Sequence, residues 1–129
     1  MIVPDGHELA NGAAVKFSEI LSYPQISLND ESTLQRFLEE RTEELDRKPN
    51  LRVKLSSFDA ICEMVNVGVG ISIIPESTAI RHRRSMDYQI VQLDEEWAIR
   101  ERKLIARDID SLPKCAKDIV ELISLPASA

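Results

Sequence analysis

LRVKLSSFDAICEMVNVGVGISIIP, residues 51–75, contains a complete strand–helix–strand unit. Its first run, Leu51–Leu55, is typical of a short strand. Ser56 and Ser57 follow, where a serine hydroxyl can accept hydrogen bonds from the free N–H groups of a helical first turn. The next apolar residues recur at helical spacing and predict one stripe packed against a sheet: Phe58, Ile61, Cys62 and Val65.

The end of the same stretch predicts a return to extended structure. Gly68 and Gly70 are expected to end the helix, because glycine is common just after the last helical turn. The largely apolar run 71–74 is typical of a strand buried on both faces, and Pro75 ends it because proline cannot donate to a sheet ladder. A strand, a crossover helix and a second strand of this kind predict an α/β fold with parallel strands.

The flanking sequence supplies further elements of both kinds. Additional strands are expected at residues 1–4, Gln25–Leu28, 88–93 and 100–107. Helices are expected at 15–21, 31–46 and Glu76–Arg83, with Asn29 or Asp30 as the cap of the second. A last helix is predicted with Ser111 as its cap, Pro113 in its first turn and a buried stripe made of Leu112, Ala116, Ile119, Val120 and Ile123.

Length and composition narrow the class of protein. A chain of 129 residues with 43% hydrophobic and 29% charged residues has the size and composition of one soluble globular domain. Its net charge of −6 disfavours nucleic-acid binding by these residues, because nucleic-acid binding selects for basic surfaces. No run of 18 apolar residues and no signal-peptide pattern is present, so no membrane association and a cytoplasmic location are expected.

Three segments resemble the effector-binding region of LysR-type transcriptional regulators. They are VPDGHELA at 3–10, SFDAICEMVNVGVGISIIP at 57–75 and WAIRERKLIARDIDSLPKCAKDIVELI at 97–123. The middle segment looks like the family's motif in which an aromatic residue opens a helix and a G-x-G-I run enters a strand that ends in proline. The resemblance implies a lobe of the type II periplasmic-binding-protein fold, with a mixed, mainly parallel sheet flanked by helices.

The same resemblance implies a division of the chain between two lobes. Residues 15–90 correspond to the second lobe of the effector-binding domain. Residues 1–14 and 91–129 correspond to the two crossover strands and to a remnant of the first lobe that includes the C-terminal helix. The helix-turn-helix that binds DNA in this family has no counterpart in these residues, so DNA is expected as a partner only through a missing N-terminal head.

Two loops are the candidate effector site: Ser27 and Asn29 after one strand, and Ser56, Ser57 and Phe58 after the next. Ligands of open α/β sheets bind beyond the carboxyl ends of parallel strands, where helix N-termini favour an anion. A small carboxylate would gain hydrogen bonds there, and Phe58 could line the apolar side. The alternative is structural, with the serines as helix caps and Phe58 in the core.

No constellation for catalysis is found in the sequence. No nucleophile–base pair or metal-ligand spacing emerges, so no catalytic residue, metal or cofactor is expected and the chain is not predicted to be an enzyme. Gly68-Val69-Gly70 does not match a dinucleotide fingerprint, because Ile73 stands where the third glycine is required. The leading interpretation is an effector-sensing module that binds a small, anionic metabolite between lobes and forms homo-oligomers. The alternatives are a fragment of a solute-binding protein and a stand-alone half-domain that acts through protein–protein contact.

Overall fold

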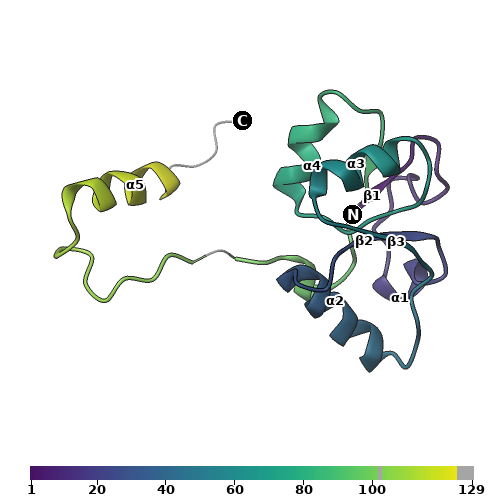
Figure 1. Ribbon diagram of the computed structural model, residues 1–129, viewed down its shortest axis with the longest axis horizontal. Helices are drawn as coiled ribbons and strands as arrows, with labels where there is room; N and C mark the ends of the chain where they lie inside the picture. Colours follow the sequence, from purple (N-terminus) through teal and green to yellow (C-terminus); the bar gives the residue numbers. More distant parts are fainter. Residues whose placement is uncertain (102, 125–129) are drawn as a thin grey trace. The chain divides into compact units, whose positions relative to one another are not determined.

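A computed structural model describes residues 1–101 and 103–124 (Figure 1). The chain divides into two compact units, Met1–Ala98 and Ile99–Ala129. The first unit contains every strand of the described chain and most of the helices. The lobe boundaries expected from the family resemblance remain a prediction, since a compact unit of the chain need not coincide with a lobe.

The parallel pair predicted from the sequence is present in the first unit. β2 (Gln25–Leu28) and β3 (Leu51–Leu55) run parallel, with Ile26 opposite Val53 and Leu28 opposite Leu55. The 12-residue helix α2 (Thr33–Glu44) connects them, and α3 (Phe58–Asn66) follows β3. The unit at 51–75 therefore forms the expected crossover, and the α/β fold class is confirmed.

The expected strand 71–74 is reduced to two bridging residues. Ile71 bridges Gln25 of β2 in the parallel sense, and Ser72 bridges Ile2 of β1 (Ile2–Val3) in the antiparallel sense. The ladder is short because, in this antiparallel register, residues 73–74 run past the start of β1. β1 in turn pairs antiparallel with β4 (Gln89–Ile90), which is the short observed part of the expected strand 88–93. The neighbours therefore run β3, β2, residues 71–72, β1, β4, which makes the sheet mixed.

Helices cover both faces of these strands. Figure 1 shows α3 and α4 (Glu76–Arg83) on one side, with α1 (Phe17–Ile20) and α2 on the other. Successive strand residues point to opposite faces, so Ile2 packs with α3 and α4 whereas Val3 packs with α1. Trp97 in the 3₁₀ turn η1 (Glu96–Ala98) makes edge contacts with Phe17 and Phe37, each with ring centroids 5.3 Å apart.

One buried polar contact anchors the α3 and α4 side. The Tyr88 hydroxyl, fully buried, donates a hydrogen bond of 2.6 Å to the carbonyl of Ala79 in α4. Burial raises the pKa of Tyr88 well above its usual value. The phenol therefore stays a neutral donor, and it fixes α4 against the segment that leads into β4.

Helix α2 begins later than the sequence predicted. Its N-cap is Ser32, whose hydroxyl accepts a hydrogen bond of 3.3 Å from the Gln35 N–H, so the prediction that Asn29 or Asp30 caps it is wrong. The β2–β3 ladder extends one residue further instead, with the Asn29 N–H donating to the Leu55 carbonyl at 2.9 Å. Leu45 is the C-cap of the helix and is 42% exposed.

The second unit departs most from the sequence predictions. The expected strand 100–107 is wrong for its described residues, 100–101 and 103–107, which form no ladder with any described strand. Helix α5 (Lys114–Ser124) is present, but it begins after Pro113, which was expected in its first turn. The predicted cap at Ser111 is wrong, since the Ser111 hydroxyl donates to the Asp108 carbonyl at 3.1 Å. No described residue of α5 is buried: Ile119 is 57% and Ile123 65% exposed, so the predicted buried stripe is uncovered in the described chain.

Gly70 allows the two backbones at the centre of the sheet to approach closely. An added Cβ at Gly70 would lie 2.5 Å from the Pro24 carbonyl oxygen, which accepts the 2.9 Å hydrogen bond of the Ile71 N–H. Backbone on both sides leaves little freedom to relieve such a contact. The sheet therefore requires the absence of a side chain at this position.

We expect Gly70→Ala to destabilise the chain by about 2–3 kcal/mol, because overpacking against backbone forces the strands apart. Urea unfolding followed by circular dichroism measures the change. Gly12→Ala is the comparison, since Gly12 has φ +87° with nothing within 4 Å and should cost only its strained backbone, about 1 kcal/mol. A loss at Gly70 no larger than at Gly12 would contradict the close approach.

Candidate functional site

The two predicted loops lie side by side at one edge of the sheet. Because β2 and β3 are parallel, both end at this edge, and the Asn29–Leu55 backbone hydrogen bond joins the loops directly. We call this surface the strand-end edge; it consists of residues 27–30 and 54–58. Its role in binding remains a prediction.

The register of the strands decides which side chains share a face there. Ser27 lies opposite Lys54 in the ladder. Leu28 and Val53 pack against the apolar cluster that includes α3, so alternation places Ser27 and Lys54 on the opposite face, on the side of α2. The hydroxyl and the ammonium group thus belong to one polar surface.

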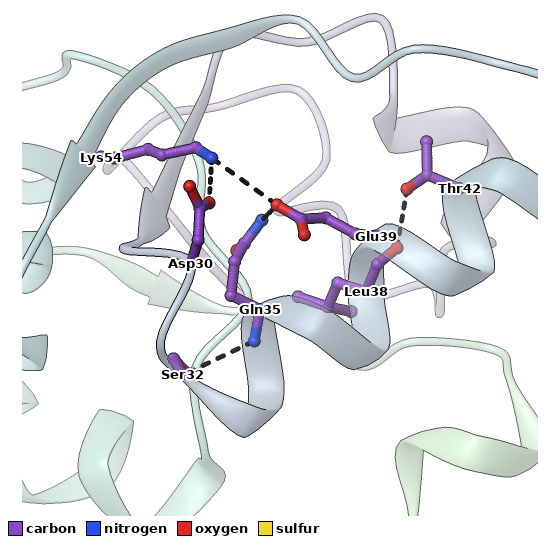
Figure 2. A network of polar contacts seen from close by, with 7 residues as sticks. All are labelled: Asp30, Ser32, Gln35, Leu38, Glu39, Thr42 and Lys54. Carbon is purple, nitrogen blue, oxygen red and sulfur yellow. Dashed lines mark hydrogen bonds and ion pairs between the residues drawn. The ribbon is translucent and has the colours of Figure 1, made fainter.

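A polar network surrounds Lys54 (Figure 2). Its ammonium group pairs with the carboxylate of Asp30 and lies 3.6 Å from that of Glu39 on α2. The Gln35 side-chain amide holds Glu39 through a hydrogen bond of 3.0 Å. The hydrogen bond to Asp30, followed by weaker contributions that include the Asp30 and Glu39 charges, raises the pKa of Lys54, which stays protonated.

Lys54 and Glu39 are not among the site residues predicted from the sequence. A signal for Lys54 existed, since it alternates with Val53 and Leu55 in a strand whose apolar residues had to face the core. Its pairing with Asp30 depends on the strand register and on the late start of α2. Neither could be read from local sequence.

Three of the predicted site residues have side chains available for binding. Within the described chain, Ser27, Asn29 and Ser56 make no side-chain hydrogen bond. Ser27 and Asn29 are half-buried, and Ser56 is exposed. These groups can donate to or accept from a small ligand at the strand-end edge.

The other two predicted residues have structural contacts. The Ser57 hydroxyl accepts a hydrogen bond of 3.2 Å from the Ala60 N–H and so caps α3, which is the structural alternative. Phe58 is half-buried and packs against the apolar cluster of α3 and α4. Both residues still border the edge, and their contribution to binding remains a prediction.

Two cavities of the described chain lie away from this edge. One, of about 270 Å³, is lined by residues that include Asp5, Arg83 and Tyr88. The other, of about 340 Å³, lies between the loop 10–14 and residues 89–92. Neither cavity is lined by residues of the strand-end edge.

The described residues offer neither a metal-binding cluster nor a membrane-spanning helix. No group of three or more His, Cys, Asp or Glu side chains among them is arranged to hold a metal ion. None of the described helices is long and apolar enough to cross a membrane.

Comparison with known proteins identifies the family. The LysR substrate binding domain matches residues 1–124, and the chain belongs to this family. A relative from Synechococcus elongatus, a probable nitrogen assimilation transcriptional activator, is 26% identical over 99 residues, 77% of this chain. The chain spans only 32% of that protein's length. The family is one of transcriptional regulators rather than enzymes.

Solved structures show the same fold. The effector binding domain of QuiR in complex with shikimate superposes with a TM-score of 0.64 at 22% identity, over 73% of this chain and 44% of that one. HinK, a LysR family transcriptional regulator from Pseudomonas aeruginosa, has a TM-score of 0.59 at 26% identity, over 73% of this chain and 32% of HinK. The expected periplasmic-binding-protein-like fold and the LysR resemblance are therefore confirmed.

The capping role of Ser57 separates it from its neighbour Ser56. We expect Ser57→Ala to lower the free energy of unfolding by about 1 kcal/mol, because α3 loses its N-cap acceptor. Ser56→Ala is the matched control and should change stability little, since its exposed hydroxyl has no partner in the described chain. Urea denaturation of both variants measures the difference; equal losses would contradict the assigned cap.

Proposed function

We propose that this chain is an effector-sensing part of a LysR-type transcriptional regulator and that it binds a small anionic metabolite at the strand-end edge. The observation that carries the proposal is the convergence of two parallel strand ends, joined by the Asn29–Leu55 hydrogen bond, on one polar surface. Ser27, Asn29 and Ser56 would orient the ligand through hydrogen bonds. Ser57 and Phe58 would border it.

Several features support an effector at this edge. Open α/β sheets bind ligands beyond the carboxyl ends of their strands. The N-terminus of the 12-residue helix α2 adjoins the edge and favours negative charge. The similar effector binding domain of QuiR holds shikimate, a carboxylate, which makes small hydroxylated carboxylates reasonable first ligands to test.

In this proposal the effector binds between two lobes, of which this chain supplies one wall. The bound effector would shift the closure of the lobes and so the spacing of DNA-binding heads. The coupling cannot exceed the difference in effector affinity between the closure states. DNA contact would come only from a helix-turn-helix outside these residues, and the regulator would act in the cytoplasm.

The second part of the proposal is homo-oligomerisation. α5 presents apolar residues on one face, including Ile119, Leu122 and Ile123, and none of its described residues is buried. A second copy of the chain is one surface that could cover this face. The uncovered apolar face of α5 also favours a second candidate function, a half-domain that acts through protein–protein contact, over a fragment of a solute-binding protein.

Effector binding is tested by titrating ¹⁵N-labelled chain with small carboxylates, shikimate among them, and following amide chemical shifts. We expect weak binding, with shifts confined to residues 27–30 and 54–58, because only one wall of the site is present. Methyl shikimate, which lacks the charge, is the matched control. Absence of shifts at this edge with every carboxylate, or shifts only around the cavity at 10–14 and 89–92, would contradict the proposed site.

Self-association is tested by sedimentation velocity over a range of concentrations. We expect the wild-type chain to associate and the double variant I119E/I123E to be monomeric, since charges on the apolar face of α5 oppose its burial. Glu121→Lys, on the charged face of the same helix, is the control and should associate like the wild type. A monomeric wild-type chain at high concentration would contradict the oligomer.

A further inference from the structure

The strand-end edge contains one cation that is placed to receive an anionic group. Lys54 is the penultimate residue of β3, opposite Ser27 and on the same face of the sheet. A lysine ammonium group has three donors. Among the described residues, Asp30 and Glu39 are the acidic groups paired with it, so its donor capacity is not exhausted.

Its two acidic partners are held very differently. Glu39 lies within helix α2, is 41% exposed and also accepts a hydrogen bond from Gln35. Asp30 lies in the loop before α2, its side chain is 68% exposed, and Lys54 is its only side-chain partner in the described chain. Asp30 can therefore leave Lys54 without breaking another contact, whereas Glu39 cannot.

We propose that Lys54 recognises the negative charge of the effector and that Asp30 occupies Lys54 until an effector carboxylate replaces it. This inference rests on the proposed effector site and assigns its charge specificity to one residue. The Asp30 side chain has the same functional group as a small carboxylate ligand, so it can act as an internal competitor. The Ser27 hydroxyl, across the ladder from Lys54, would contact a ligand hydroxyl.

The charge balance gives the proposal a distinctive consequence. Lys54, Asp30 and Glu39 together carry a charge of −1, which opposes the approach of an anion. Removing the charge of Asp30 makes this cluster neutral and frees one Lys54 donor. The two halves of a single ion pair should therefore change anion binding in opposite directions.

The experiment titrates the ¹⁵N-labelled full chain with lactate and, as a neutral match, lactamide. We expect Asp30→Asn to bind lactate about two- to fivefold more tightly than wild type. Lys54→Gln should bind lactate more weakly than wild type by at least the same factor. Lactamide should bind all three proteins alike. Circular dichroism verifies that each variant is folded before it is titrated.

Lys103 supplies the control, because it pairs with Glu101 at 3.4 Å in an exposed ion pair that is not part of the strand-end edge. Lys103→Gln should leave lactate binding unchanged. Lactate shifts at the strand-end edge that are equal in wild type, Asp30→Asn and Lys54→Gln would overturn the role of Lys54 and leave the proposed effector site standing. If lactate shifts no residue of the strand-end edge in any of these proteins, the role of Lys54 is overturned. The titration with the other small carboxylates then tests the proposed effector site separately.

Discussion

The sheet depends on two residues, Ile71 and Ser72, that join its two ladders. Ile71 donates to the Pro24 carbonyl at 2.9 Å and accepts from the Ile26 N–H at 2.9 Å. Ser72 exchanges two backbone hydrogen bonds with Ile2, and its hydroxyl donates to the Ile26 carbonyl at 2.6 Å. Because Ser72 is buried, losing these partners would leave polar groups unsatisfied. The β2–β3 pair is thereby joined to β1 and β4.

The chemistry at the strand-end edge follows from where helix α2 begins. With Ser32 as the cap, Asp30 lies outside the helix, in a loop from which its carboxylate reaches Lys54 on the neighbouring strand. A cap at Asn29 or Asp30, as the sequence suggested, would have used a polar side chain of this loop for the first helical turn. The late start therefore leaves Asn29 and Asp30 available for ligands and ion pairs.

Sequence reasoning succeeded where the decisive interactions are local and failed where they are not. The strand, cap and helix at 51–66 were predictable because Ser57 and the apolar spacing of α3 act within a few residues. The strand expected at 100–107 needs a partner to form a ladder, and no described strand provides one. The ion pair of Lys54 was missed for a related reason, since it depends on the register that places Lys54 opposite Ser27 and beside Asp30.

Helix α5 shows what periodicity does and does not report. An amphipathic stripe indicates the surface that a helix is suited to bury, but it does not identify the surface that covers it. The family match extends through residue 124, whereas the structural superpositions cover 73% of the chain, and α5 has no buried residue among those described. Ile119 and Ile123 belong to the second unit, and Lys54 and Ser27 to the first. The association and the effector recognition that we propose therefore involve separate parts of the sequence, so a substitution in α5 can test one proposal without altering the groups named in the other.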